Sequence, residues 1–244
     1  NYGDVMPMFR DHEAFRDEAG NIYAVPWVWG STALAYNSDA IDEQITSWKQ
    51  MWSGKYKGQI AFYDEYFSAI VTASLYLGED PADPDMEKVR EALMDMQSQA
   101  KTYWGSYDDW FKAFKSREIV IGNVWTGGVT PLQDEGEPIV YVYPEEGAIG
   151  WADSWVILKD APHPELALKW IDYATSEYFQ YQMAIYPEQK NTPTNVKVLD
   201  KLNDDERKAL LIYPEIPDNL FLQYQTEEQQ AQWVAFWDEI KATS

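Results

Sequence analysis

The chain has 244 residues, of which 45% are hydrophobic, and a formal net charge of −22 from 41 acidic and 19 basic side chains. This composition is typical of a folded protein of one or two domains, and the negative charge argues against nucleic acid or an anionic membrane as a partner. The absence of cysteine excludes disulfides and thiolate chemistry. With only two histidines, a histidine metal cluster or a nucleophile–histidine pair is not expected.

Extended segments alternate with helical segments along the chain. Apolar and aromatic runs predict extended segments at residues 22–30, 31–37, 59–63, 118–124, 138–143 and 149–158. Helical periodicity and capping residues predict helices over residues 48–52, 68–77, 83–100, 107–114, 164–186 and 227–242. This alternation predicts an α/β protein with mostly parallel sheets flanked by helices.

The order of these segments also predicts two lobes. Residues 38–150 hold enough strands and helices for one complete α/β lobe, so residues 1–37 and 151–244 would form a second, discontinuous lobe together. In a two-lobed α/β protein the expected ligand site is the cleft between the lobes, beyond the carboxyl ends of the strands.

Carboxylates and indoles recur near the ends of the predicted strands. The candidate site residues on this ground are Trp29, Asp64, Glu65, Trp125, Trp151 and Asp153. Indole faces attract ammonium groups, carboxylates form charge-assisted hydrogen bonds with them, and flat rings bury methylenes. The pattern therefore favours capture of an organic cation without covalent chemistry, cofactor or metal. Ordinary core packing of the tryptophans and helix capping by Asp64 are the structural alternatives.

An enzymatic alternative is a carbohydrate-active enzyme. Two carboxylates at a cleft can hydrolyse a glycoside while aromatic rings stack on the sugars. Nothing in the sequence fixes an acid and a base at matched spacing, so this alternative is the weaker one.

Several motifs resemble, in the same order, those of the spermidine/putrescine-binding proteins, which are periplasmic components of ABC importers. Residues 23–33 (YAVPWVWGSTA) are similar to the family's Y-x-[IV]-P-Y-x-W-G-x-T-A segment. The resemblance continues through residues 47–58, 122–127 (GNVWTG), 143–154 (YPEEG and WADS), 213–214 and 224–225. The matched motifs are collinear over most of residues 20–225.

The resemblance implies a two-lobed type 2 periplasmic binding fold and a polyamine ligand, spermidine or putrescine, held in an aromatic and acidic cleft between the lobes. By this resemblance the ligand contacts are Trp125, Trp151, Asp153, the acidic residue Glu65 with Asp64 beside it, and Gln225. It also implies ABC permease subunits as partners, a monomer, and a periplasmic location, or an extracellular, membrane-anchored one in a Gram-positive organism.

Two features depart from the family pattern. The family's second carboxylate falls on Ser68, so the ligand could be shorter or singly charged, and a quaternary amine, thiamine or another amino compound is the alternative ligand. Family members also begin well before the residue that aligns with Asn1, which is not a methionine. We therefore expect a trimmed or processed product, with its signal peptide removed, whose first lobe lacks its N-terminal strands.

Overall fold

The computed structural model describes residues 1–186 and 190–243. The described residues form two compact units, each built from separate stretches of chain. Unit 1 comprises Asn1–Gly30 and Trp151–Ile216, and unit 2 comprises Ser31–Gly150 and Pro217–Ser244. The strands β1 (Ala24–Asn37) and β6 (Ala148–Val156) each continue from one unit into the other.

Unit 2 is organised around β2 (Ile60–Tyr63), which pairs in parallel with β3 (Ala100–Trp104) and with β4 (Ile121–Trp125). The second half of β1 runs antiparallel to β4 and to β5 (Ile139–Val142), and Thr32 lies opposite Trp125. The strand β8 (Leu220–Leu222) pairs in parallel with the start of β6. The α/β class is therefore confirmed, but the sheet is mixed and not mostly parallel, because β1 reverses the strand direction.

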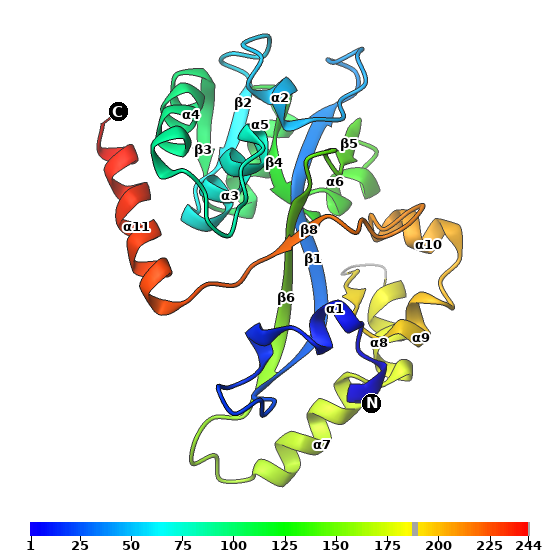
Figure 1. Cartoon of the computed structure of the whole chain (residues 1–244). Coiled ribbons are helices and arrows are strands. Elements are labelled where there is room, and N and C mark those ends of the chain that lie inside the picture. Colours follow the sequence, from blue (N-terminus) through cyan, green and yellow to red (C-terminus); the bar gives the residue numbers. More distant parts are fainter. Residues whose placement is uncertain (187–189, 244) are drawn as a thin grey trace. The chain divides into compact units, whose positions relative to one another are not determined.

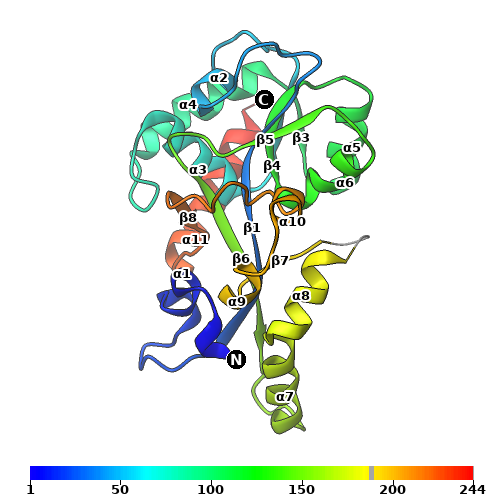
Figure 2. The same cartoon turned by 90° about the vertical axis from the view of Figure 1, so that its right-hand side faces the viewer.

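Helices cover both sides of these strands. Figure 2 shows α3 (Tyr66–Leu77) and α4 (Met86–Gln99) on one side, and α5 (Tyr107–Lys115) and α6 (Thr130–Asp134) on the other. Ser47 precedes the short helix α2 (Trp48–Met51) and caps it as predicted, in a full capping box with Gln50. The turn η3 (Thr126–Gly128) follows β4. The core between α3, α4 and the strands is rich in fully buried aromatic and aliphatic side chains.

The last helix, α11 (Glu227–Ala242), packs against α3 and α4 of unit 2 (Figure 1). Its buried residues Trp233, Phe236, Trp237 and Ile240 belong to the core cluster of that unit. The division into compact units thus differs from the predicted boundaries at residues 31–37 and 217–244, which belong here with residues 38–150. The physical reason is that β1 pairs with β4, and α11 buries its apolar side on α3.

Unit 1 contains the first half of β1, the second half of β6 and the helical segments around them. The helical segments are η1 (Tyr2–Asp4), α1 (Pro7–Arg10), η2 (Glu13–Phe15), α7 (Pro164–Ala174), α8 (Glu177–Ile185), α9 (Val196–Leu199) and α10 (Asp204–Ala209). Unit 1 also contains the short strand β7 (Thr192–Pro193), which pairs with β1. The predicted helix over 164–186 is interrupted, because Ser176 caps α8 by accepting a hydrogen bond from the Phe179 N–H.

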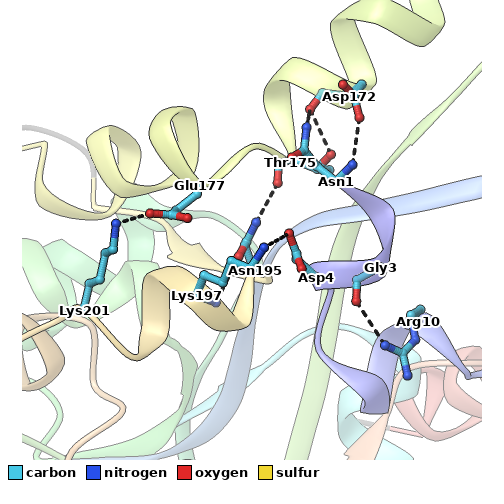
Figure 3. Close-up of polar contacts among 10 residues, drawn as sticks. All are labelled: Asn1, Gly3, Asp4, Arg10, Asp172, Thr175, Glu177, Asn195, Lys197 and Lys201. Atoms are coloured by element: carbon cyan, nitrogen blue, oxygen red, sulfur yellow. Dashed lines mark hydrogen bonds and ion pairs between the residues drawn. The ribbon is translucent and has the colours of Figure 1, made fainter.

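The beginning of the chain is fastened to unit 1 by polar contacts (Figure 3). The N-terminal ammonium lies 2.9 Å from a carboxylate oxygen of Asp172 on α7, and Lys197 on α9 lies 2.8 Å from Asp4. A hydrogen bond from the Asn195 side chain to the Thr175 carbonyl joins the start of α9 to the end of α7. These contacts order the segment that leads into β1.

Candidate functional site

Three parallel strands of unit 2 each end in an aromatic residue: β2 at Tyr63, β3 at Trp104 and β4 at Trp125. Because β2 is parallel to both neighbours, these residues meet at one edge of the sheet, which is where α/β proteins commonly bind ligands. The ring of Tyr63 stacks on Trp104 at 4.4 Å and meets Trp125 edge-on at 4.9 Å. We call these three residues the strand-end cluster.

The members of the strand-end cluster differ in what they can offer a ligand. Trp104 is fully buried and donates its indole N–H to the Asn123 carbonyl at 3.2 Å, so it supports the other two. Tyr63 and Trp125 remain partly exposed. Burial and the charges of Glu65 and Asp64 raise the pKa of Tyr63, so its phenol stays neutral at physiological pH. The cluster therefore presents two partly exposed, uncharged aromatic rings.

Asp64 follows the strand-end cluster, but its carboxylate is already engaged. The same oxygen accepts the indole N–H of Trp237 at 2.9 Å and lies 3.2 Å from the Lys241 ammonium. Both partners come from α11, and the Lys241 ammonium also lies 5.7 Å from the centre of the Trp237 ring. Asp64 thus joins the strand end to the last helix.

Glu65 caps α3. One carboxylate oxygen accepts the N–H of Phe67 at 3.0 Å and the other accepts the N–H of Ser68 at 2.8 Å. These N–H groups have no partner within the helix, so the cap satisfies them and places negative charge at the positive end of the helix. The capping that the sequence suggests for Asp64 is performed by its neighbour.

Gln225 lies just after β8 in unit 2. Its side-chain Nε2 is buried and makes no hydrogen bond within the described residues. A buried donor without an acceptor is costly, so a hydrogen-bond partner for this amide would stabilise the protein.

A hydroxyl cluster that the sequence did not reveal connects β1 to β5. The buried Ser31 hydroxyl donates to the Tyr143 hydroxyl at 2.9 Å, and the Tyr141 hydroxyl donates to the Ser31 carbonyl at 2.9 Å. Burial raises the pKa of Tyr143 to about 12 and that of Tyr141 well above its ordinary value, so both phenols are neutral at physiological pH. Tyr141 lies on β5 and Tyr143 directly follows that strand, and this spacing of two residues in an extended segment is a signal that would have pointed to a shared side.

Unit 1 carries the other predicted residues. Trp151 and Asp153 stand two positions apart on β6 and therefore point to the same side of the strand. Asp153 is exposed, yet the protein around it removes enough solvent to raise its pKa, and it makes no hydrogen bond or ion pair within the described ranges. Among the predicted acidic residues, it alone lacks a partner there.

Trp29 is a core residue of unit 1. Only 2% of its surface is exposed, its indole N–H donates to the Pro193 carbonyl at 3.0 Å, and its ring lies 5.8 Å from that of Phe9. The packing gives Trp29 a structural role and leaves almost no surface for a ligand.

The seven predicted residues therefore fall on both units. Unit 2 holds Asp64, Glu65, Trp125 and Gln225, and the first three come from neighbouring strand ends. Unit 1 holds Trp29, Trp151 and Asp153. Within the described residues no group of three or more His, Asp or Glu side chains is placed to hold a metal ion, and no helix there is long and apolar enough to span a membrane.

Comparisons with known proteins agree on one family. A family model described as bacterial extracellular solute-binding protein matches residues 4–211. The spermidine/putrescine-binding periplasmic protein of Salmonella typhimurium is 32% identical over 160 residues, and the putrescine/agmatine-binding protein of Pseudomonas aeruginosa is 29% identical over 175 residues. Each match covers 64% of this chain but only 45% and 48% of the relative, so the chain spans less than half the length of these relatives.

Solved structures share the fold. The spermidine/putrescine ABC transporter substrate-binding protein of Streptococcus pneumoniae matches 99% of this chain and 74% of its own, with a TM-score of 0.83 and 20% identity. A protein described as a GABA receptor matches 97% of this chain and 74% of its own, with a TM-score of 0.74 and 22% identity.

Proposed function

The chain belongs to the bacterial extracellular solute-binding proteins, and from that premise we propose that it captures a small organic cation bearing an amine and delivers it to an ABC importer. Spermidine and putrescine are the first ligands to test, because the curated relatives are described as binding them. The proposed partners are permease subunits, the proposed location is the periplasm or the outer face of the cell membrane, and the proposed state is a monomer that carries out no chemistry on its ligand.

The strand-end cluster is the observation that carries this proposal. Tyr63 and Trp125 offer partly exposed aromatic faces at the carboxyl ends of parallel strands. An aromatic face attracts a cation by about 0.5–2 kcal/mol, and each methylene buried against it contributes about 0.8 kcal/mol. A net charge of −22 also draws cations toward the protein.

The other proposed contacts are polar. Asp153 supplies an unpaired carboxylate for a charge-assisted hydrogen bond to an ammonium, and Trp151 stands beside it on the same strand. Gln225 supplies a buried amide whose donor is unsatisfied within the described residues. We assign Trp29, Asp64 and Glu65 to structural roles, because each is already buried, paired or capping.

A thermal-shift panel of amines followed by calorimetry tests the proposal, since a bound ligand raises the melting temperature by mass action. We expect at least one amine to bind, a sugar panel to have no effect, and Trp125→Ala to weaken binding at least tenfold. Trp125→Phe keeps an aromatic face and should lose less. Tyr178→Ala removes a ring that is 67% exposed in unit 1 and serves as the control. If no amine binds, or if Trp125→Ala binds as the wild type does, the proposal is wrong.

A further inference from the structure

The strand-end cluster adjoins a buried asparagine, Asn123, at the point where the pairing of β2 with β4 ends. The register between these strands covers Ile60 with Ile121 and Ala61 with Gly122. Gly122 lies so close to β2 that a Cβ built on it would be 2.2 Å from the Ala61 carbonyl oxygen. One residue further along β4, the side chain of Asn123 continues the contact between the two strands.

Asn123 replaces the next hydrogen bond of the ladder. Its side-chain oxygen Oδ1 accepts the backbone N–H of Tyr63 at 2.8 Å. A backbone N–H that is shielded from water needs an acceptor, and an asparagine amide can take the place of a peptide carbonyl. The position of the Tyr63 peptide, and therefore of its ring, is set by this side chain and not by the regular ladder.

The backbone of Asn123 holds the second member of the cluster. Its carbonyl oxygen accepts the indole N–H of Trp104 at 3.2 Å, and the Trp104 carbonyl in turn accepts the Asp64 N–H at 2.9 Å. Trp125 is two residues further along β4, and its ring lies 4.6 Å from that of Trp104. One residue therefore contacts Tyr63 and Trp104 through its two oxygens and stands two positions from the third member.

Stability alone gives little reason for an amide at this position. Asn123 is fully buried, and its Nδ2 makes no hydrogen bond in the described part of the chain. A buried donor without an acceptor costs free energy, whereas a leucine would fill a similar space without that cost. Leucine would leave the Tyr63 N–H without its acceptor. What the amide supplies is this one acceptor, beside partly exposed rings.

We propose that Asn123 is the positioning residue of the strand-end cluster: its Oδ1 fixes the Tyr63 peptide and thereby sets how the rings of Tyr63 and Trp125 face a ligand. The inference rests on the proposed function, because it takes these two rings as the binding surface. Every residue that it uses lies within unit 2. Asn123 acts through Tyr63 and does not itself touch the ligand.

Two substitutions of Asn123 separate the acceptor from the space that it fills. Asn123→Leu removes Oδ1 and keeps a branched side chain of similar size. Asn123→Asp keeps an oxygen at the same place, because burial favours the neutral acid, and it loses only an Nδ2 that has no partner among the described residues. The control is Asn37→Leu. It removes another buried amide of unit 2 with an unpartnered Nδ2, whose Oδ1 accepts the Asp39 N–H at 2.9 Å beside the start of β4.

Nuclear magnetic resonance of the ligand-free protein tests the arrangement directly, because neighbouring aromatic rings shift the ring protons of Tyr63 and Trp125. We expect Asn123→Leu to change these shifts and to speed hydrogen exchange at the Tyr63 N–H by about tenfold or more. Asn123→Asp should stay close to the wild type, and Asn37→Leu should keep the ring shifts even where urea titration shows an equal loss of stability. Asn123→Ala, which also removes the acceptor, takes the place of a leucine variant that does not fold.

The inference is overturned by wild-type ring shifts in the variant without the acceptor. It is also overturned by changes in Asn123→Asp or Asn37→Leu as large as those in Asn123→Leu, because the acceptor would then not be their cause.

Calorimetry with putrescine and spermidine carries the test to the ligand. We expect Asn123→Leu to bind the better of the two about tenfold or more weakly than the wild type does, Asn123→Asp to lose less, and Asn37→Leu to bind as the wild type does. Equal affinities of the wild type and Asn123→Leu overturn the inference while the proposed function stands. If the wild type binds no amine, the proposed function fails, and the ring shifts of the ligand-free protein still decide whether Asn123 positions the cluster.

Discussion

Replacing Asp153 by asparagine should stabilise the unliganded protein while weakening its binding of ligand. Burial raises the pKa of Asp153 above its ordinary value of 3.8, which means that the protein disfavours the charged carboxylate. No partner in the described residues compensates that charge. One unit of pKa shift corresponds to about 1.4 kcal/mol, but the side chain is exposed and solvent screens the effect, so we expect a gain of at most about 0.5 kcal/mol. For a chain of this length that is a rise in melting temperature of about 1–2 °C.

The dependence on pH follows from the direction of the shift. Since the folded state holds the Asp153 proton more tightly than the unfolded state, the stability of the wild type falls as pH rises from about 3.8 through the raised pKa. Asparagine does not titrate. The advantage of Asp153→Asn should therefore be absent at low pH, develop across that window and stay constant up to neutral pH.

Thermal unfolding between about pH 3 and pH 7 measures this difference, with Asp42→Asn as a control that removes one exposed carboxylate from unit 2. The control accounts for the general benefit of lowering a net charge of −22. Calorimetry with the best amine should show at least a tenfold loss for Asp153→Asn, or about 1.4 kcal/mol. Equal affinity, or a melting temperature at pH 7 no higher than that of the control, would refute the reasoning.

Three further substitutions test the framework of unit 2. Glu65→Ala should lower the free energy of unfolding by about 1 kcal/mol in urea titrations, whereas Glu65→Asn should keep most of the cap; equal losses would argue against capping. Gly122→Ala should cost about 2 kcal/mol or more because its Cβ would overlap the Ala61 carbonyl oxygen, while Gly105→Ala, with open space around it, should cost far less; similar unfolding midpoints would contradict this. Trp237→Phe removes the indole N–H that donates to Asp64 and should lower the free energy of unfolding by about 1–2 kcal/mol in urea titrations. An unchanged free energy of unfolding would mean that this hydrogen bond contributes little to stability.

The sequence predicted most strands and helices of the fold, and its errors have local causes. The strand β3 escaped notice because Ala100 follows Gln99, the last residue of α4, without any connecting loop. The helical pattern over residues 83–100 therefore absorbed the start of the strand. Two predicted extended runs proved to be the single strand β1, since Gly30 and Ser31 continue the strand without a turn.

The predicted strand ends gave the position of Trp125 to within one residue, because it was expected directly after the strand over 118–124 and is the last residue of β4. They did not predict the strand-end cluster. Its other two members, Tyr63 and Trp104, meet because β2 pairs in parallel with β3, and the sequence analysis did not predict β3. Sequence periodicity identifies the sides of one strand, whereas the meeting of strand ends depends on which strands are neighbours.

The roles of Asp64 and Glu65 show a limit of a different kind. The two carboxylates are adjacent, and either residue type can cap a helix or bind a cation. The choice depends on where the backbone turns from extended to helical, which is at Glu65, and on a tryptophan 173 residues further along the chain that reaches Asp64. The position of a carboxylate at a strand end therefore predicts that it lies near a binding site. Whether its charge is free to bind a ligand depends on the hydrogen bonds and ion pairs that it already makes.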